Sequence, residues 1–161
     1  MGRKNYRMLP LESNGGLINT VMHEMCHVFG LGTLWERRGL ILLPSPTNPI
    51  FTGANAMREF ATLLGEPAPT VVPVANRGRA GTFGGHWRES VFGNELMTGF
   101  LDGGVNPLSR MTIASLEDLG YSVNYDAADP FELPSQRGLA LMGITADGDT
   151  SHLCTMCRGA L

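Results

Sequence analysis

The sequence predicts a single α+β domain that is mostly helical and rich in loops. Three segments carry helix-like patterning, and one short segment is rich in valine. The 161 residues include 21 glycines and 10 prolines, which predicts irregular connections between short elements. This length suffices to bury a real core but is short for a two-lobed enzyme.

The charge balance argues against nucleic acid and anionic membranes as partners. Only 17% of the residues are charged, and the formal net charge is −3, without a basic run that would bind either surface. No segment approaches the ~20 apolar residues that cross a bilayer. The start of the chain also lacks a signal-peptide core, so the residues alone define neither the compartment nor the oligomeric state.

A first helix is expected over residues 17–29, after the turn-forming run 13–16. Gly30 follows it and tolerates the left-handed backbone of a sharp exit. At about 100° per residue, His23 and His27 fall on one side of this helix. The opposite side carries an apolar stripe that we expect to face the core, formed by Ile18, Val21, Met22, Met25 and Phe29.

The middle of the chain predicts one helix and one weak strand. Residues 43–52 are rich in Pro and Asn and are expected to form a loop. Residues 54–64 predict a short helix ended by Gly65. Residues 70–74 fit a brief strand, and Pro73 would confine it to a sheet edge.

The second half of the chain contains a glycine-rich loop and a further helix. Residues 76–85 include four glycines and lead to His86. A helix is expected over 109–119, with Ile113, Leu116 and Leu119 facing inward. We therefore expect a domain over residues 1–134 and an appended C-terminal tail over 135–161.

His23-Glu24-Met25-Cys26-His27 is an HExxH sequence on the first predicted helix. Two histidines four residues apart can bind one Zn²⁺ through ring nitrogens at about 2.0–2.1 Å. Glu24 lies about 100° further around the helix, where it can accept a proton from a metal-activated water. The alternative is a helix with two surface or hydrogen-bonded histidines and a solvated glutamate.

A catalytic zinc site normally has a third protein ligand. The most common extended motif places a histidine six residues after the second one, but Thr33 occupies that position. The third ligand is therefore His86 or a carboxylate such as Glu36 or Glu59. His86 follows the glycine-rich loop and precedes Trp87, which suits a positioned ligand, although a loop histidine packed beside a tryptophan has the same pattern.

These motifs together resemble the leishmanolysin-like metallopeptidases of the metzincin group. The resemblance runs from Gly15 to Phe131 and keeps the order of the family's motifs. It is carried by four segments: residues 23–30, His86-Trp87, residues 92–97 (Phe-Gly-Asn-Glu-Leu-Met) and residues 106–121. In that family an insertion separates the motif's glycine, here Gly30, from the third histidine.

The resemblance implies zinc-dependent endopeptidase activity on protein or peptide substrates. One catalytic Zn²⁺ would be bound by His23, His27 and His86, with Glu24 as the general base. Met97 would lie in the Met-turn, as an apolar floor beneath the imidazoles. The resemblance also suggests a secreted or cell-surface location.

The implied fold is a metzincin-like zincin catalytic domain with its N-terminal sheet largely missing. Only about sixteen residues precede the active-site helix, and segments 40–43 and 71–74 could supply part of a sheet. The competing hypothesis is a catalytically inactive zinc-binding or interaction domain derived from such a peptidase.

Two further groups of residues have open roles. Glu95 could accept the second ring N–H of a metal-bound histidine, or be a surface residue. In the tail, His152, Cys154 and Cys157 have the spacing of a zinc knuckle without a second pair of ligands, so we expect two incidental thiols. Cys26, the third cysteine, is expected to be a small buried apolar residue.

Overall fold

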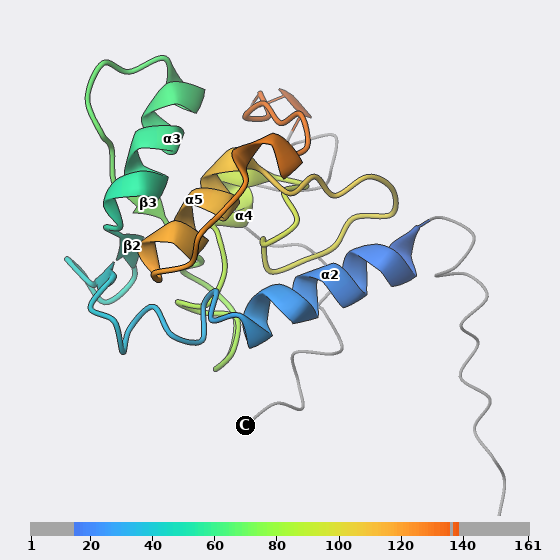
Figure 1. The fold of residues 1–161 in the computed structure, drawn as a ribbon. Helices are drawn as coiled ribbons and strands as arrows, with labels where there is room; N and C mark the ends of the chain where they lie inside the picture. The colour runs from blue at the N-terminus through green and yellow to red at the C-terminus, as the bar shows by residue number, and fades with distance from the viewer. Residues whose placement is uncertain (1–14, 136, 139–161) are drawn as a thin grey trace, which may run out of the picture.

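The computed structural model describes residues 15–135 and 137–138 (Figure 1). Within these residues the chain combines helices with a small antiparallel sheet, which confirms the mixed α and β class. The elements in chain order are helix α2 (Gly16–Val28), strands β1 (Ile41–Leu42) and β2 (Ile50–Phe51), helix α3 (Ala54–Leu64), strand β3 (Val72–Pro73), helices α4 (Glu89–Phe92) and α5 (Arg110–Asp118), and the 3-10 helix Tyr125–Ala127.

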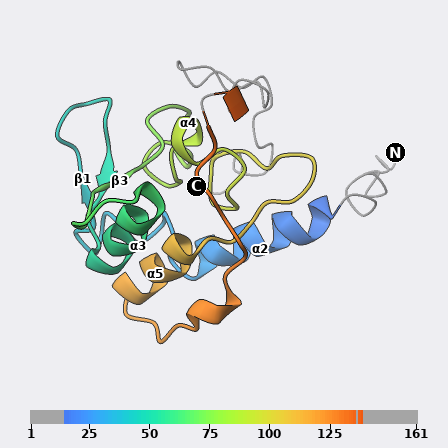
Figure 2. The same ribbon diagram turned by 90° about the horizontal axis from the view of Figure 1, so that it is seen from above.

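Helices α3 and α5 pack against each other, and both occur where the sequence predicts them (Figures 1 and 2). The carboxylate of Asp118, at the end of α5, accepts hydrogen bonds from the backbone N–H groups of Asn55 and Ala56, both at 2.9 Å. It therefore supplies the N-terminal cap that α3 lacks in its own sequence. A side chain on Gly53 would collide with this carboxylate, so the contact requires glycine.

The three strands form one sheet in the order β1-β2-β3, with antiparallel pairing throughout. Ile50 and Phe51 lie within the segment 43–52 that we expected to be a loop, so that prediction was wrong at its end. β3 confirms the predicted strand, and Pro73 lies on an edge strand as expected. Segments 40–43 and 71–74 thus contribute to the same small sheet.

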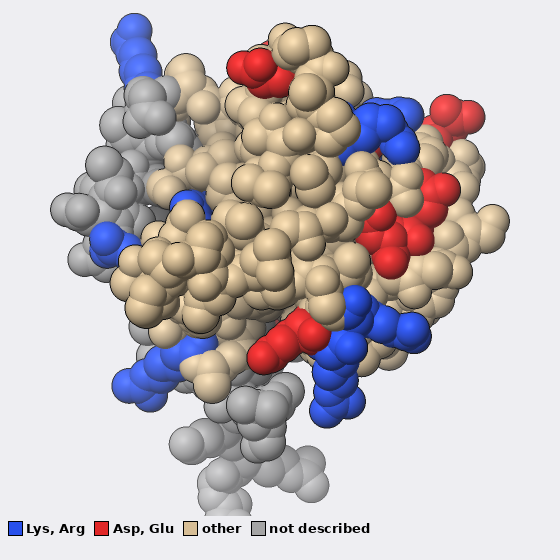
Figure 3. Space-filling view, turned by 90° about the vertical axis from the view of Figure 1, so that its left-hand side faces the viewer, with Lys and Arg blue, Asp and Glu red and all other residues tan. Residues whose placement is uncertain are grey.

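The face of the molecule in Figure 3 carries no large patch of side chains of a single charge. Acidic and basic side chains form small groups there, and in places a red group lies next to a blue one. Among the described residues, no helix has the length and apolar character to cross a membrane.

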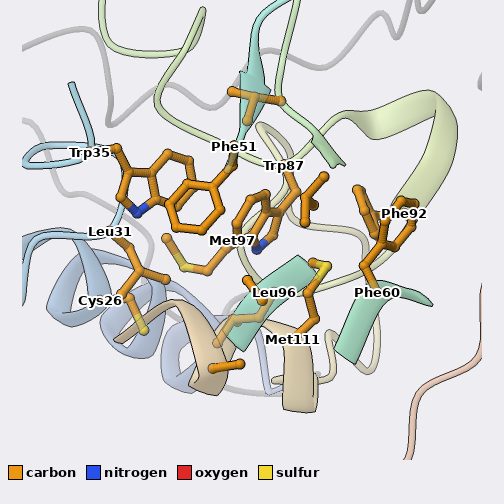
Figure 4. Packing of buried hydrophobic residues seen from close by; sticks show 14 of the residues in the cluster. Cys26, Leu31, Trp35, Phe51, Phe60, Trp87, Phe92, Leu96, Met97 and Met111 are labelled. Atoms are coloured by element: carbon orange, nitrogen blue, oxygen red, sulfur yellow. The ribbon is translucent and has the colours of Figure 1, made fainter. Parts of the chain in front are cut away.

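A cluster of aromatic side chains forms the centre of the core (Figure 4). The rings of Trp35 and Trp87 lie 4.5 Å apart between centroids, and Phe51 contacts both rings edge-on. Phe92, on the unpredicted helix α4, extends the cluster from Trp87 to Phe60 on α3. Because Trp87 directly follows His86, this packing fixes the loop that carries the third histidine.

Helix α2 packs in the orientation opposite to the one predicted. Ile18 is 65% exposed and Val28 is 83% exposed, whereas His23 is 2% exposed. The prediction that the apolar stripe faces the core was wrong, because segments 86–97 and 31–35 cover the histidine side instead. Cys26 is buried on that side, as expected. Val28 lies outside the predicted stripe, whose own exposed side chains are Ile18, Val21, Met25 and Phe29, while Met22 is half-buried.

Candidate metal centre

Helix α2 places His23 and His27 one turn apart, with ring centroids 4.7 Å from each other. The chain reverses directly afterwards, because Gly30 adopts a φ of 108° that favours glycine. Thr33, at the position where extended motifs have a histidine, donates its hydroxyl hydrogen bond to the carbonyl of His27 at 2.8 Å. Thr33 therefore stabilises the end of the helix and does not act as a ligand.

His86 enters the site from the glycine-rich loop and is fully buried. Its carbonyl accepts the N–H of Ala75 at 2.8 Å, and the N–H of Trp87 donates to Met97 at 2.9 Å. The loop also passes very close to the exit of α2, since a Cβ atom on Gly32 would lie 1.9 Å from the carbonyl oxygen of Gly85. Gly32 is therefore required for His86 to reach the helix.

The three Nε2 atoms converge on one point. They lie 3.0 Å apart for His23 and His27, 3.0 Å for His27 and His86, and 3.1 Å for His23 and His86. Tetrahedral nitrogen ligands at about 2.0–2.1 Å from a zinc ion would lie roughly 3.3 Å apart. The observed triangle is close to that size, and within the described residues these three form the one His, Cys, Asp or Glu cluster that could hold a metal.

Backbone carbonyls determine the tautomer of each imidazole. Nδ1 of His23 lies 2.7 Å from the carbonyl oxygen of Leu96, and Nδ1 of His27 lies 2.8 Å from that of Leu31. Nδ1 of His86 lies 3.3 Å from the carbonyl oxygen of Thr82. A carbonyl only accepts, so each Nδ1 carries the proton and each Nε2 presents a bare lone pair.

Burial keeps the imidazoles of His23 and His86 neutral. It lowers the pKa of His23 to about 4, against a hydrogen bond to Leu96 that raises it, and lowers the pKa of His86 to about 3. Three lone pairs at about 3 Å repel one another and have no proton to share. A cation at their centre satisfies all three, so the donor set fits a metal ion of the kind that imidazole binds.

A surface hollow opens beside this cluster at His27, and the neighbouring residue of His23, Glu24, has a carboxylate oxygen that is unpartnered within the described part of the chain. Glu24 follows His23 and is partly buried, and its Oε1 atom is buried without a hydrogen-bond partner among the described residues. The hollow has a volume of about 670 Å³ and runs from His27 along the exit turn to the loop 81–85. Leu34 and Phe83 contribute apolar walls, which leaves room for a polypeptide segment next to the histidines.

The other residues considered for the site occupy different places in the structure. Met97 is fully buried in the core, next to the residue whose carbonyl binds His23. Glu95 is fully buried and accepts no imidazole N–H among the described residues, so both alternatives, a direct histidine partner and a surface residue, were wrong. Glu36 and Glu59 do not belong to the metal cluster: Glu36 lines the hollow, and Glu59 pairs with Arg110 at 3.2 Å.

Sequence reasoning missed the groups that hold the imidazoles in place. Leu31, Thr82 and Leu96 act through backbone carbonyls, so their side chains give no signal of this role. Ser109 and Thr112 bind the buried carboxylate of Glu95, and only their position at the start of a predicted helix hinted at a polar role. His152, Cys154 and Cys157 lie outside the described residues.

The fold and the site define a mixed α and β domain with a cluster of three histidines that could hold a metal ion, two of them on an HExxH helix. The sequence profile of the leishmanolysin family matches residues 10–143. The chain therefore belongs to the leishmanolysin family of peptidases.

Curated relatives carry related descriptions. A leishmanolysin homolog of Crithidia fasciculata is 25% identical over 134 residues, which cover 78% of this chain and 20% of the relative. A leishmanolysin-like peptidase of Caenorhabditis elegans is 42% identical over 65 residues, which cover 39% of this chain and 10% of the relative. The chain thus spans a fifth or less of the length of these relatives. No solved structure matches it.

Proposed function

We propose that this chain carries the catalytic site of a metzincin-type zinc endopeptidase that hydrolyses internal peptide bonds of protein or peptide substrates. The observation that carries the proposal is the convergence of three bare Nε2 lone pairs from His23, His27 and His86 at 3.0–3.1 Å. An array of this kind binds a metal while leaving a further coordination position open. Met97 would support the site from the core, and Gly30 would end the active-site helix.

The chemistry divides between the metal and Glu24. A bound zinc ion supplies Lewis acidity, which makes water more acidic and polarises the scissile carbonyl. Glu24 takes the proton of the attacking water through its unpartnered Oε1 and returns it to the leaving amine. The hollow beside His27 holds the substrate backbone next to these groups.

The Glu24→Gln variant tests this function. We expect about one zinc per chain in both proteins, with cleavage of casein or quenched peptides lost in the variant and after chelation of the wild-type protein. Glu66→Gln, an exposed glutamate after α3, is the matched control and should retain cleavage. Equal cleavage by the zinc-loaded wild-type and Glu24→Gln proteins would reject Glu24 as the base.

One observation favours a second candidate, a zinc-binding interaction domain without catalysis. The apolar face of α2 is exposed, with Ile18 at 65% and Val28 at 83%, as in a surface that binds another polypeptide. The retained Glu24 argues against this candidate, because a structural metal site needs no base. Stoichiometric zinc without cleavage of any peptide would favour it over the peptidase.

A further inference from the structure

Glu95 is a fully buried carboxylate whose two oxygens face only hydrogen-bond donors. Oε2 accepts the backbone N–H of Met97 at 2.6 Å. Oε1 accepts the N–H of Ser109 at 3.1 Å and the hydroxyl of Ser109 at 2.7 Å, and also the hydroxyl of Thr112. Four donors from two distant segments therefore meet on one side chain.

The direction of each bond is fixed by its neighbours. The indole N–H of Trp87 donates to the Thr112 hydroxyl at 2.8 Å, and the backbone N–H of Thr112 donates to the Ser109 hydroxyl at 3.2 Å. Both hydroxyls thus accept one bond and direct their own hydrogens to Glu95. Burial raises the pKa of Glu95 above its ordinary value, although the four donors oppose this effect, but a proton on either oxygen would face a donor. The network is complete only with the carboxylate ionised.

The same network reaches two of the three histidines. Glu95 fixes the N–H of Met97, and the peptide before Met97 carries the Leu96 carbonyl that binds His23 Nδ1 at 2.7 Å. The Met97 carbonyl accepts the N–H of Trp87, the neighbour of His86. Thr112 binds both Glu95 and the Trp87 indole.

We propose that Glu95 is a positioning residue for the metal site: its carboxylate fixes the turn 95–97, so that the Leu96 carbonyl and Trp87 orient His23 and His86. The proposal rests on the metal-binding part of the proposed function and not on catalysis. Groups that orient metal-bound histidines typically contribute 10–100-fold to metal affinity.

Glu95→Gln breaks this arrangement selectively. The amide NH₂ of glutamine must replace one oxygen, and placing it at Oε1 would oppose three donors, whereas placing it at Oε2 opposes only the N–H of Met97. The variant should therefore keep its bonds to α5 and lose the bond to the turn. Ser115→Ala is the matched control, because it removes a buried hydroxyl of α5 that donates to the Thr112 carbonyl at 2.7 Å and makes no bond to Glu95.

The test measures zinc affinity by chelator competition and the visible spectrum of the cobalt-substituted protein, both at a temperature where each variant is folded by circular dichroism. We expect Glu95→Gln to bind zinc 10–100-fold more weakly and to shift the cobalt absorption. Ser115→Ala should lower the melting temperature yet bind zinc within about twofold of wild type. Unchanged zinc affinity and cobalt spectrum in folded Glu95→Gln would overturn the proposal and leave Glu95 a purely structural residue.

Thr112→Val gives an independent reading if Glu95→Gln does not fold. It removes the hydroxyl between Glu95 and Trp87, so zinc affinity should fall less than in Glu95→Gln but measurably; wild-type affinity in the folded protein would overturn the proposal. A wild-type chain that binds neither zinc nor cobalt would overturn the metal site itself, and with it both proposals. Loss of hydrolysis alone would affect only the proposed function.

Discussion

The two faces of helix α2 differ in what covers them. His23 and Cys26 are at most 9% exposed, while Ile18 and Val28 on the other side are at least 65% exposed. The buried face is the one with the polar imidazoles, and it is buried because the Leu96 carbonyl, from a distant segment, and the Leu31 carbonyl, from the exit turn, provide acceptors for its two rings. Apolar spacing shows which residues share a face, but only the partner decides which face is covered.

Removal of His86 should have the largest effect on the buried face. His86→Ala leaves two of three converging nitrogens, so we expect zinc affinity to fall by more than the roughly 100-fold upper range for loss of an orienting group. Competition with a chelator measures this change, with Glu66→Gln as a control. Wild-type zinc affinity in His86→Ala would show that another group completes the site.

The approach of the glycine loop to the exit of α2 makes a second strong prediction. Gly32 and Gly39 have φ values of 70° and 69°, so alanine at either position costs about 1–2 kcal/mol in backbone strain. Only at Gly32 would the new Cβ also meet a backbone atom, at 1.9 Å. This clash should add about 1–3 kcal/mol.

Urea unfolding of Gly32→Ala and Gly39→Ala gives the comparison directly. We expect Gly32→Ala to be the less stable protein and to lose zinc affinity as well, because Gly85 and His86 must move. Equal destabilisation by the two substitutions would mean that the loop does not rest on the exit turn.

The pH dependence of the free energy of unfolding, measured on the metal-free protein, tests whether the buried His23 and His86 are neutral in the fold. In the fold the pKa of His23 is about 4 and that of His86 about 3, against an ordinary value of 6.5. The unfolded chain therefore binds more protons below pH 6.5, and the free energy of unfolding should fall as the pH falls from 6.5 towards 4.

Glu89 acts in the opposite direction and must be removed for a clear measurement. Burial, together with nearby Asp102, raises the pKa of Glu89 from 4.5 to about 8, so its contribution to stability is lost as the pH rises from 4.5 through 8. In Glu89→Gln, the free energy of unfolding should no longer decline as the pH rises above 6.5, but it should still fall as the pH drops below 6.5. A flat profile below pH 6.5 would show that the imidazoles are accessible to protons.

The sequence predicted local features better than their tertiary partners. The bounds of α3 and the ends of α2 and α5 follow from glycine stops and helical spacing, and these agree with the structure to within one residue. His23 and His27 follow from a spacing of four, whereas His86 was singled out only by the resemblance, because 58 residues intervene before it. The carbonyls of Leu31, Thr82 and Leu96 could not be predicted, since any residue type offers the same acceptor.

The smallest effect is expected on the apolar face of α2. Cys26→Ser puts a hydroxyl into the buried side and should cost about 1–3 kcal/mol if that group finds no partner. Val28→Ser changes a side chain that is 83% exposed, so the free energy of unfolding should stay within about 0.5 kcal/mol of wild type. Urea unfolding of the two variants measures both values. A loss of more than about 1 kcal/mol in Val28→Ser, well above that range for exposed positions, would show that the apolar face is covered in solution. If the loss grows with protein concentration, a second copy of the chain provides the cover.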